Sequence, residues 1–204
     1  MIIALAGNIG SGKTTLAGLL SKELGFEVEY EEEDNPYIVD FYADMQRWSF
    51  NMQIHFLNNR LKQAIPLRSS ESNVIQDRTI YEDAEIFSPN LLAMGMMTQR
   101  DYHTYKTLFD TVQQLITPPD LVIYLKASVS TLVDQIASRG RDYEDSIRID
   151  YLRKLNERYD EWFANYKLGK KLEVCVDDLD FKNNPEHLGT ILNKVSGELY
   201  GLFK

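Results

Sequence analysis

The chain has 204 residues, which fits a single folded domain over residues 1–204, and hydrophobic residues make up 44% of it, enough for an ordinary packed core. Its 22 basic and 31 acidic side chains give a net charge of −9, which argues against general binding to nucleic acid or to anionic membranes. With one cysteine, Cys175, and no apolar window of membrane-span or signal-peptide length, we expect a cytoplasmic protein without an intrachain disulfide.

Apolar runs and helical periodicity alternate along the chain. Residues 2–6, IIALA, form an apolar run that ends at a glycine, which predicts a buried strand. Strands that alternate with helices are typical of α/β proteins, so we predict a parallel five-stranded sheet with helices on both faces. Ligands bind such sheets at the carboxyl ends of the strands. The other predicted strands are 27–30, 73–77, 120–126 and 172–176, and the predicted helices are 13–23, 41–62, 98–116, 128–138, 146–165 and 185–199.

A phosphate-binding motif follows the first predicted strand. Residues 7–14, GNIGSGKT, match G-x-x-x-x-G-K-[ST] in full, at a point where a strand passes into a helix. The glycines let backbone N–H groups converge on phosphate oxygens, and the helix N-terminus adds a favourable dipole. We expect Lys13 on the β- and γ-phosphates and the Thr14 hydroxyl on Mg²⁺. The residues predicted to hold ATP here are Gly7, Asn8, Ile9, Gly10, Ser11, Gly12, Lys13 and Thr14.

Charged residues follow three other predicted strands. Glu31 opens an acidic run after the second strand, where a carboxylate can take up or orient the proton of an acceptor hydroxyl. Asp77 and Arg78 end the third strand; Asp77 can hold a magnesium-bound water and Arg78 can clamp a phosphoryl group. Arg139 and Arg141 flank a glycine, which suits a lid that closes over phosphates. A solvated acidic turn, a surface ion pair and a helix C-terminus would explain the same residues without a function.

Together these residues resemble the deoxyribonucleoside kinases, specifically the bacterial deoxyadenosine/deoxyguanosine kinase group. The resemblance covers nearly the whole chain and includes an acid at Glu31, N-P at Asn35-Pro36, a D-R-T motif at 77–79 and R-x-R-x-x-E from Arg139 to Glu144. It implies a P-loop NTPase-type fold with an arginine-rich lid at about 139–145. It also implies transfer of the γ-phosphate of ATP, with Mg²⁺, to the 5′-hydroxyl of a deoxyribonucleoside in nucleotide salvage. A homodimer and feedback by a deoxynucleoside triphosphate are further implications.

The resemblance also assigns roles to individual side chains. Glu31, Arg78 and Lys13 are the implied catalytic groups, and Thr14 and Asp77 the implied metal-binding groups. The segment before Asn35 is one residue shorter than is usual in the family, so Glu32 remains the alternative to Glu31 as the base. The implied nucleoside-binding residues are Glu31, Tyr42, Gln53, Arg60, Arg78, Asp83, Phe87 and Glu144, and the implied donor-binding residues beyond the P-loop are Arg139, Arg141, Asp180 and Phe181.

The chemistry of three side chains predicts the kind of base. Gln53 and Arg60 are seven positions apart on one predicted helix and therefore share a face. The Gln53 amide offers one donor and one acceptor, while Asp83 can accept from an exocyclic amine and Arg60 can hold Asp83 ionised. We expect an amino-bearing base, with deoxyadenosine first, deoxyguanosine and deoxycytidine as alternatives, and thymidine disfavoured. Phe87 is expected to stack on the base, whereas core packing explains Trp48 better than stacking does.

Two other functions share part of this pattern. A nucleoside-monophosphate kinase such as one resembling thymidylate kinase has the same fold, P-loop and lid, but it needs a further basic residue for the acceptor phosphate. Tyr42 and Glu144 instead suit a free sugar. A P-loop switch protein would use nucleotide as a conformational signal, but the sequence lacks the N-K-x-D-type motif that is usual in GTP switches. An assay for phosphoryl transfer separates all three.

Overall fold

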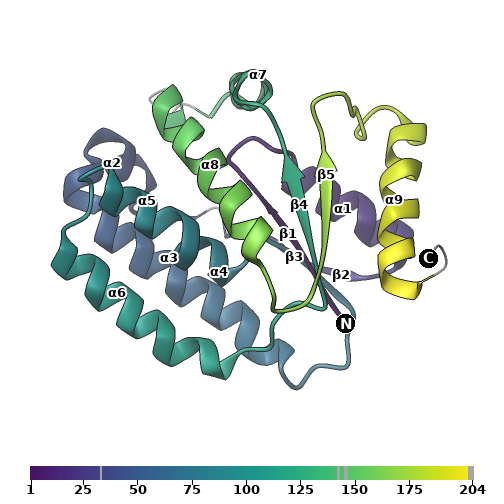
Figure 1. The fold of residues 1–204 in the computed structure, drawn as a ribbon, viewed down its shortest axis with the longest axis horizontal. Helices are drawn as coiled ribbons and strands as arrows, with labels where there is room; N and C mark the ends of the chain where they lie inside the picture. The colour runs from purple at the N-terminus through teal and green to yellow at the C-terminus, as the bar shows by residue number, and fades with distance from the viewer. Residues whose placement is uncertain (33, 142, 145–146, 202–204) are drawn as a thin grey trace.

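A five-stranded sheet forms the centre of the molecule (Figure 1). The computed structural model describes residues 1–32, 34–141, 143–144 and 147–201. All strand pairs are parallel and the strand order is β2-β3-β1-β4-β5, so the carboxyl ends of the strands share one edge. The predicted parallel α/β sheet is therefore confirmed. The strands are β1 (Ile2–Gly7), β2 (Glu27–Glu29), β3 (Val74–Asp77), β4 (Leu121–Lys126) and β5 (Lys170–Cys175).

Helices cover both faces of the sheet (Figure 1). On one face, α1 and α9 pack their apolar stripes against the strands, with Leu16 and Ile191 in one core cluster. On the other face, α3, α6 and α8 form a larger cluster around Phe109 and Leu155. This two-sided cover explains why β1 and β4 are apolar and buried almost throughout. The helices are α1 (Lys13–Leu24), α2 (Ile38–Ala43), α3 (Met45–Leu67), α4 (Ile80–Glu82), α5 (Ser88–Ala93), α6 (Gln99–Val112), α7 (Val129–Arg139), α8 (Ile149–Asn165) and α9 (Pro185–Tyr200).

The single helix predicted over 41–62 is wrong in its boundaries. The chain forms α2 and α3 there, and the break between them lies at Asp44. The Asp44 carboxylate accepts a hydrogen bond from the backbone N–H of Arg47 at 3.1 Å, so it caps a new helix instead of continuing the old one. The α3 helix also runs five residues past the predicted end, to Leu67. Tyr42 and Gln53 consequently lie on two different helices.

The segment between β3 and α6 contains helical structure that the sequence pattern did not reveal. It consists of α4, a π-helical turn over Asp83–Phe87, and α5. Thr79 and Glu82 form a reciprocal capping box at its start. Within the residues described, no helix is both long enough and apolar enough to cross a bilayer.

Candidate active site

A cleft of about 780 Å³ opens at the carboxyl edge of the sheet, within the usual size range of small-molecule sites. It brings together side chains from the P-loop, from α3 and from the predicted lid, which are far apart in the sequence. Arg60 and Asp77 do not line it, and lie buried behind the residues that do. The predicted site residues that line the cleft are Ile9, Gly10, Gly12, Lys13, Thr14, Glu31, Tyr42, Gln53, Arg78, Asp83, Phe87, Arg139, Arg141 and Glu144.

The glycines of the P-loop allow its backbone conformation and the close packing of another loop against it. Gly12 has a φ of +89°, and a Cβ there would lie 2.8 Å from the ring of Phe181. Phe181 belongs to the loop after β5, so the predicted donor-base loop packs directly on the phosphate cradle. Asp180 in the same loop is exposed and accepts a hydrogen bond from the backbone N–H of Asn183. The glycine at position 12 is therefore required by backbone conformation and by the close approach of Phe181.

Lys13 is buried inside this cradle. Its Nζ donates hydrogen bonds to the carbonyl oxygens of Gly7 and Asn8, each at 2.9 Å. Burial away from water and, to a smaller extent, the nearby Arg78 guanidinium lower the pKa of Lys13 to about 8. Lys13 is thus a cation at neutral pH that is poised to bind anionic oxygens.

Asn8 fixes the P-loop to helix α8. Its Nδ2 donates to the carbonyl oxygen of Leu152 at 2.9 Å and to Oδ1 of Asn156 at 2.7 Å. Asn156 in turn donates to the carbonyl oxygen of Ala127, just after β4. Nearby, the buried hydroxyl of Ser11 has no hydrogen-bond partner among the described residues. The first turn of the loop is therefore tied to a helix that follows it by more than 140 residues.

Thr14 and Asp77 form a pair that fits Mg²⁺. The Thr14 hydroxyl donates to Asp77 Oδ2 at 2.5 Å, and the buried Asp77 Oδ1 has no hydrogen-bond partner among the described residues. One hydroxyl and one carboxylate suit a cation that keeps several waters and takes its remaining ligands from phosphates. No cluster of three or more His, Cys, Asp or Glu side chains that could hold a metal alone occurs in the described ranges.

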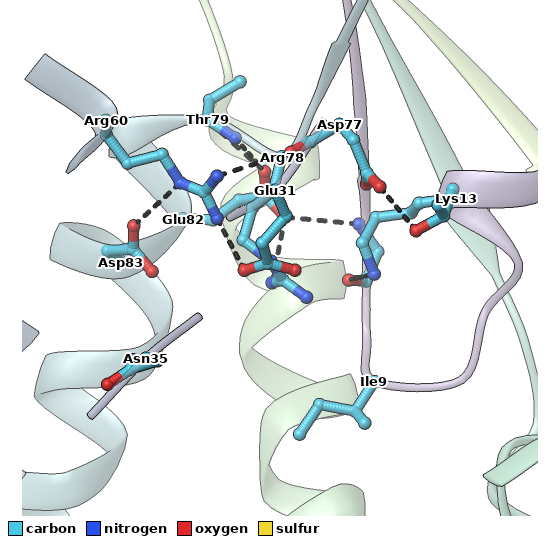
Figure 2. A network of polar contacts seen from close by, with 12 residues as sticks. Ile9, Lys13, Glu31, Asn35, Arg60, Asp77, Arg78, Thr79, Glu82 and Asp83 are labelled. Carbon is cyan, nitrogen blue, oxygen red and sulfur yellow. Dashed lines mark hydrogen bonds and ion pairs between the residues drawn. The ribbon is translucent and has the colours of Figure 1, made fainter. Parts of the chain in front are cut away.

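Glu31 lies between two arginines. Its Oε1 accepts a hydrogen bond from Arg60 Nη2 at 2.7 Å and lies 3.4 Å from Arg78 Nε. Burial alone would raise the pKa of Glu31, but Arg78 and Arg60 outweigh it and hold this pKa at about 2. Figure 2 shows the Glu31 carboxylate between Arg60 on one side and Lys13 of the P-loop on the other. Of the two candidate bases, Glu31 is the ion-paired one, whereas Glu32 lines the cleft as an exposed side chain.

Arg78 is held by groups that the sequence pattern did not reveal. Its backbone has a φ of +76°, a region that side-chain-bearing residues rarely adopt. Its Nη1 donates to the Tyr159 hydroxyl at 2.7 Å and lies 3.4 Å from Glu82 Oε1. The wholly buried Glu82 could have been noticed from the capping pattern T-x-x-E at Thr79. Tyr159 carries no comparable signal, because its partner Arg78 lies 81 residues away.

The far end of the cleft carries two hydrogen-bond acceptors. Gln53 is 3% exposed, and its Oε1 has no hydrogen-bond partner within the described part of the chain. Asp83 Oδ2 lies 3.4 Å from Arg60 Nε, but burial outweighs the two arginines nearby and raises the pKa of Asp83 to about 6. At neutral pH the Gln53 amide oxygen and the Asp83 carboxylate can therefore both accept hydrogen bonds from a ligand. The sequence predicts that Arg60 contacts the ligand, and the structure corrects this. Arg60 does not line the cleft, and it forms ion pairs with Glu31 and Asp83 instead.

The predicted sugar contacts lie beside the lid. Burial raises the pKa of Tyr42 well above its ordinary value, with Tyr151 and Glu144 adding to the effect, so the hydroxyl stays neutral. Glu144 is buried and pairs with Arg139, which donates from Nε at 3.1 Å, and more distantly with Arg141. The Tyr143 ring stacks on Tyr42 at 6.0 Å. Residues 142 and 145 of the predicted lid, and 33 in the acidic run, lie outside the described residues.

Known proteins resemble this chain in sequence and in fold. The family model described as deoxynucleoside kinase matches residues 3–199. A deoxyadenosine/deoxycytidine kinase from Bacillus subtilis is 35% identical over 204 residues, which cover 98% of this chain and 93% of the relative. A deoxyguanosine kinase from Lactobacillus johnsonii is 34% identical and covers 97% of this chain and 92% of the relative. The structure of deoxyadenosine kinase from M. mycoides with bound dATP superposes with a TM-score of 0.83 at 35% identity, over 96% of this chain and 100% of that one.

Proposed function

The chain belongs to the deoxynucleoside kinase family, and we propose that it transfers the γ-phosphate of ATP to the 5′-hydroxyl of deoxyadenosine for nucleotide salvage. The observation that carries this proposal is the single cleft, which a P-loop lines at one end and Gln53 and Asp83 at the other. Relatives with full-length coverage are named for deoxyadenosine, deoxycytidine and deoxyguanosine, so the family supplies the reaction and the pocket must supply the base preference.

Charge stabilisation is assigned to the cations around the P-loop. Phosphoryl transfer passes through a loose transition state, in which positioning and electrostatics do most of the work. Lys13 and Arg78 face the cleft and would stabilise charge on the moving phosphoryl group. Arg139 and Arg141 would exchange their pairing with Glu144 for phosphate oxygens. Mg²⁺ held through Thr14 and Asp77 would neutralise charge on the β- and γ-phosphates.

Glu31 is assigned to the acceptor hydroxyl. A carboxylate with a pKa of about 2 is a weak proton acceptor at neutral pH, so its main task would be to orient the 5′-hydroxyl for in-line attack. The proton moves to Glu31 late, as the oxygen–phosphorus bond forms. Arg60 and Arg78 keep the carboxylate charged and in place throughout.

The base preference follows from unmet hydrogen-bond acceptors. Gln53 Oε1 has no partner among the described residues, and leaving a buried acceptor unpaired costs about 1–3 kcal/mol. An exocyclic amine on adenine can supply the missing donor, and Asp83 can accept a second hydrogen bond. Guanine and cytosine also carry an amine, whereas thymine would set a carbonyl oxygen against these acceptors. Deoxyadenosine is therefore proposed first, with the other two as alternatives.

The acceptor is proposed to be a nucleoside and not a nucleoside monophosphate. Tyr42 and Glu144 approach one another at the cleft and offer a hydroxyl and a carboxylate, which suit a sugar 3′-hydroxyl. The position expected for the 5′-oxygen is faced by Glu31, and a second phosphate there would meet like charge. This arrangement favours a free 5′-hydroxyl.

The deciding experiment is an assay with ATP, Mg²⁺ and a panel of acceptors. Each of the four deoxynucleosides and its 5′-monophosphate is offered, and the products are separated by chromatography. We expect deoxyadenosine monophosphate as the main product and no phosphorylation of monophosphates. Transfer to a monophosphate alone would establish the alternative kinase class. Stoichiometric ATP binding without transfer to any acceptor would instead indicate a nucleotide switch.

Three further properties belong to the same proposal. A homodimer is proposed at a groove beside α3 and α6 that Phe50, Ile54, Leu61 and Leu108 line. Feedback by a deoxynucleoside triphosphate is proposed because M. mycoides deoxyadenosine kinase has been solved with bound dATP and with bound dCTP. A cytoplasmic location is proposed because the free Cys175 fits a reducing compartment.

A further inference from the structure

A buried carboxylate joins the P-loop to Arg78 without facing the cleft. Glu82 is 0% exposed, and its Oε2 accepts a hydrogen bond from the backbone N–H of Thr79 at 2.7 Å. Its Oε1 accepts from the backbone N–H of Gly7 at 3.3 Å and from the Tyr159 hydroxyl at 2.8 Å. The same oxygen lies 3.4 Å from Arg78 Nη1. The carboxylate therefore links the last residue of β1 to the guanidinium that follows β3.

Tyr159 completes this link from helix α8. Its hydroxyl accepts from Arg78 Nη1 at 2.7 Å while it donates to Glu82, so it bridges the two. Leu152, Asn156 and Tyr159 follow one another at spacings of four and three, so they share one face of α8. That face holds Asn8 of the P-loop at one point and Arg78 at another. A single rigid helix thus fixes both parts of the phosphate-binding machinery.

Arg78 needs such support because a competing partner lies close by. Its Nε is 3.4 Å from Glu31 Oε1, an oxygen that also accepts a hydrogen bond from Arg60, and an arginine beside a carboxylate tends to form a bidentate pair. That pairing would turn the guanidinium away from the phosphates and occupy the carboxylate proposed to orient the 5′-hydroxyl. The short contact with Tyr159 holds the opposite end of the guanidinium, and the Phe87 ring lies 4.7 Å from its central carbon.

We propose that Tyr159 and Glu82 are positioning residues that hold Arg78 in line with the phosphate cradle and prevent its collapse onto Glu31. The proposal rests on the proposed phosphoryl transfer. It predicts that removal of the Tyr159 hydroxyl lowers turnover but leaves substrate binding nearly intact, because the hydroxyl acts only through the direction of Arg78.

The test uses Tyr159→Phe, which removes one oxygen and keeps the ring stacked on Tyr124. We expect kcat to fall about tenfold, with KM for ATP and for deoxyadenosine within twofold of the wild-type values. Tyr166→Phe is the matched control, because its buried hydroxyl has no partner among the described residues and its loss should leave both constants unchanged. All assays are run where circular dichroism shows each variant fully folded, so unfolding cannot produce the split.

A double-mutant cycle shows whether Tyr159 acts through Arg78. In an Arg78→Lys background the hydroxyl has lost its guanidinium partner, so adding Tyr159→Phe should change kcat less than twofold. A further tenfold loss in that background, a KM effect as large as the kcat effect, or unchanged kcat in Tyr159→Phe alone would overturn the proposal. A wild-type chain that phosphorylates no deoxynucleoside would contradict the proposed function instead. The failure of the proposed function is therefore distinguishable from the failure of the positioning role.

Glu82→Gln provides an independent measurement. The amide keeps the shape of the side chain but removes the charge that balances Arg78, so the same pattern of lowered kcat and preserved KM is expected. Recovery of turnover in Glu82→Asp, relative to Glu82→Gln, would show that the charge matters. Equal activity of Glu82→Gln and wild type would remove Glu82 from the proposal.

Discussion

The buried charges of this site set one another's proton affinity. Burial alone would disfavour the charged form of every group, but the direction of the pKa shift differs from residue to residue. Glu31 has a lowered pKa because Arg78 and Arg60 outweigh its burial, whereas Asp83 has a raised pKa because burial outweighs the effect of Arg60 and Arg78. The groups whose pKa is shifted in this way are the cations Lys13, Arg60 and Arg78 and the acids Glu31 and Asp83.

Glu31→Gln tests the residue assigned to the acceptor hydroxyl. The amide cannot receive the proton and holds Arg60 and Arg78 less firmly, so we expect kcat to fall about 10²-fold or more. Nucleoside binding, measured by calorimetry, should stay within a few-fold because Gln53 and Asp83 are unchanged. Glu32→Gln is the control and should retain wild-type turnover. The reverse result, with only Glu32→Gln inactive, would move the role to Glu32.

The pKa of Lys13 predicts a pH dependence for donor use. Because this pKa is lowered to about 8, the free enzyme loses the cation as pH rises through 8. Bound phosphates favour the charged form and raise the pKa again. We therefore expect kcat/KM for ATP to fall above pH 8, while kcat at saturating ATP falls only at higher pH. Parallel pH profiles for the two constants would contradict this account.

Asp83 predicts a second pH effect at the base. With a pKa raised to about 6, it is a carboxylate at pH 7.5 and mostly a neutral acid at pH 5.5. The neutral acid presents a hydrogen atom to the adenine amine, so kcat/KM for deoxyadenosine should fall below pH 6. Asp83→Asn should show a low and flat profile over the same range. In Asp83→Asn the ratio of kcat/KM for deoxyadenosine to kcat/KM for thymidine should also fall about tenfold, with KM for ATP unchanged.

Individual site residues could be predicted where the strand order alone brings them together. Asp77 ends β3 and Glu31 follows β2, and because these two strands pair in parallel, both residues lie at the same edge of the sheet. The capping pattern at Thr79 points to Glu82, but the contacts of Glu82 with Tyr159 and Arg78 could not be predicted, because they depend on how residues distant in the sequence pack. The inward position of Arg60 also depends on packing, since helical spacing shows which face a residue shares but not which partner it reaches.

Helix boundaries were the less predictable feature at the scale of elements. The apolar periodicity runs unbroken through α2 and α3, so only the capping residue Asp44 marks the break. Between Thr79 and Ala93 the helical segment includes a π-helical turn and Pro89, which disturb the 3.6-residue period. A search for capping residues would have found both starts, because Asp44 and Thr79 satisfy backbone N–H groups that the hydrophobic pattern ignores.

The P-loop helix gives a prediction at the same scale. Gly12→Ala places a methyl group 2.8 Å from the Phe181 ring on a backbone with φ of +89°. We expect the loop to shift, with KM for ATP raised at least tenfold and stability lowered by about 1–2 kcal/mol. Gly197→Ala is the matched control, because it lies inside α9 where a Cβ meets nothing within 4 Å. It should leave KM unchanged and stabilise the helix by about 0.5–1 kcal/mol in thermal unfolding.

At the scale of the whole molecule, the sheet separates two kinds of surface. Its carboxyl edge carries the charged cleft, whereas α3 and α6 pack side by side on the outside of one face (Figure 1). Beside these helices lies a groove of about 500 Å³, in which apolar side chains such as Phe50, Ile54, Leu61 and Leu108 outnumber the polar Asn51, His55 and Asn58. Exposed apolar surface of this kind marks interfaces in soluble proteins. The proposed homodimer is therefore expected to form here and to leave both clefts open.

Leu108→Asp tests this interface. Leu108 is 40% exposed and lines the groove, so a carboxylate there would be buried without a partner if two copies meet across α3 and α6. Light scattering after gel filtration should give twice the chain mass of 23.6 kDa for wild type and the single mass for the variant. Leu168→Asp is the matched control, because Leu168 is 51% exposed but lies between α8 and β5, outside the groove. A wild-type monomer would show that no dimer forms across this face. A dimer of the Leu108→Asp variant would show that the subunits meet elsewhere, so either result would contradict the assignment.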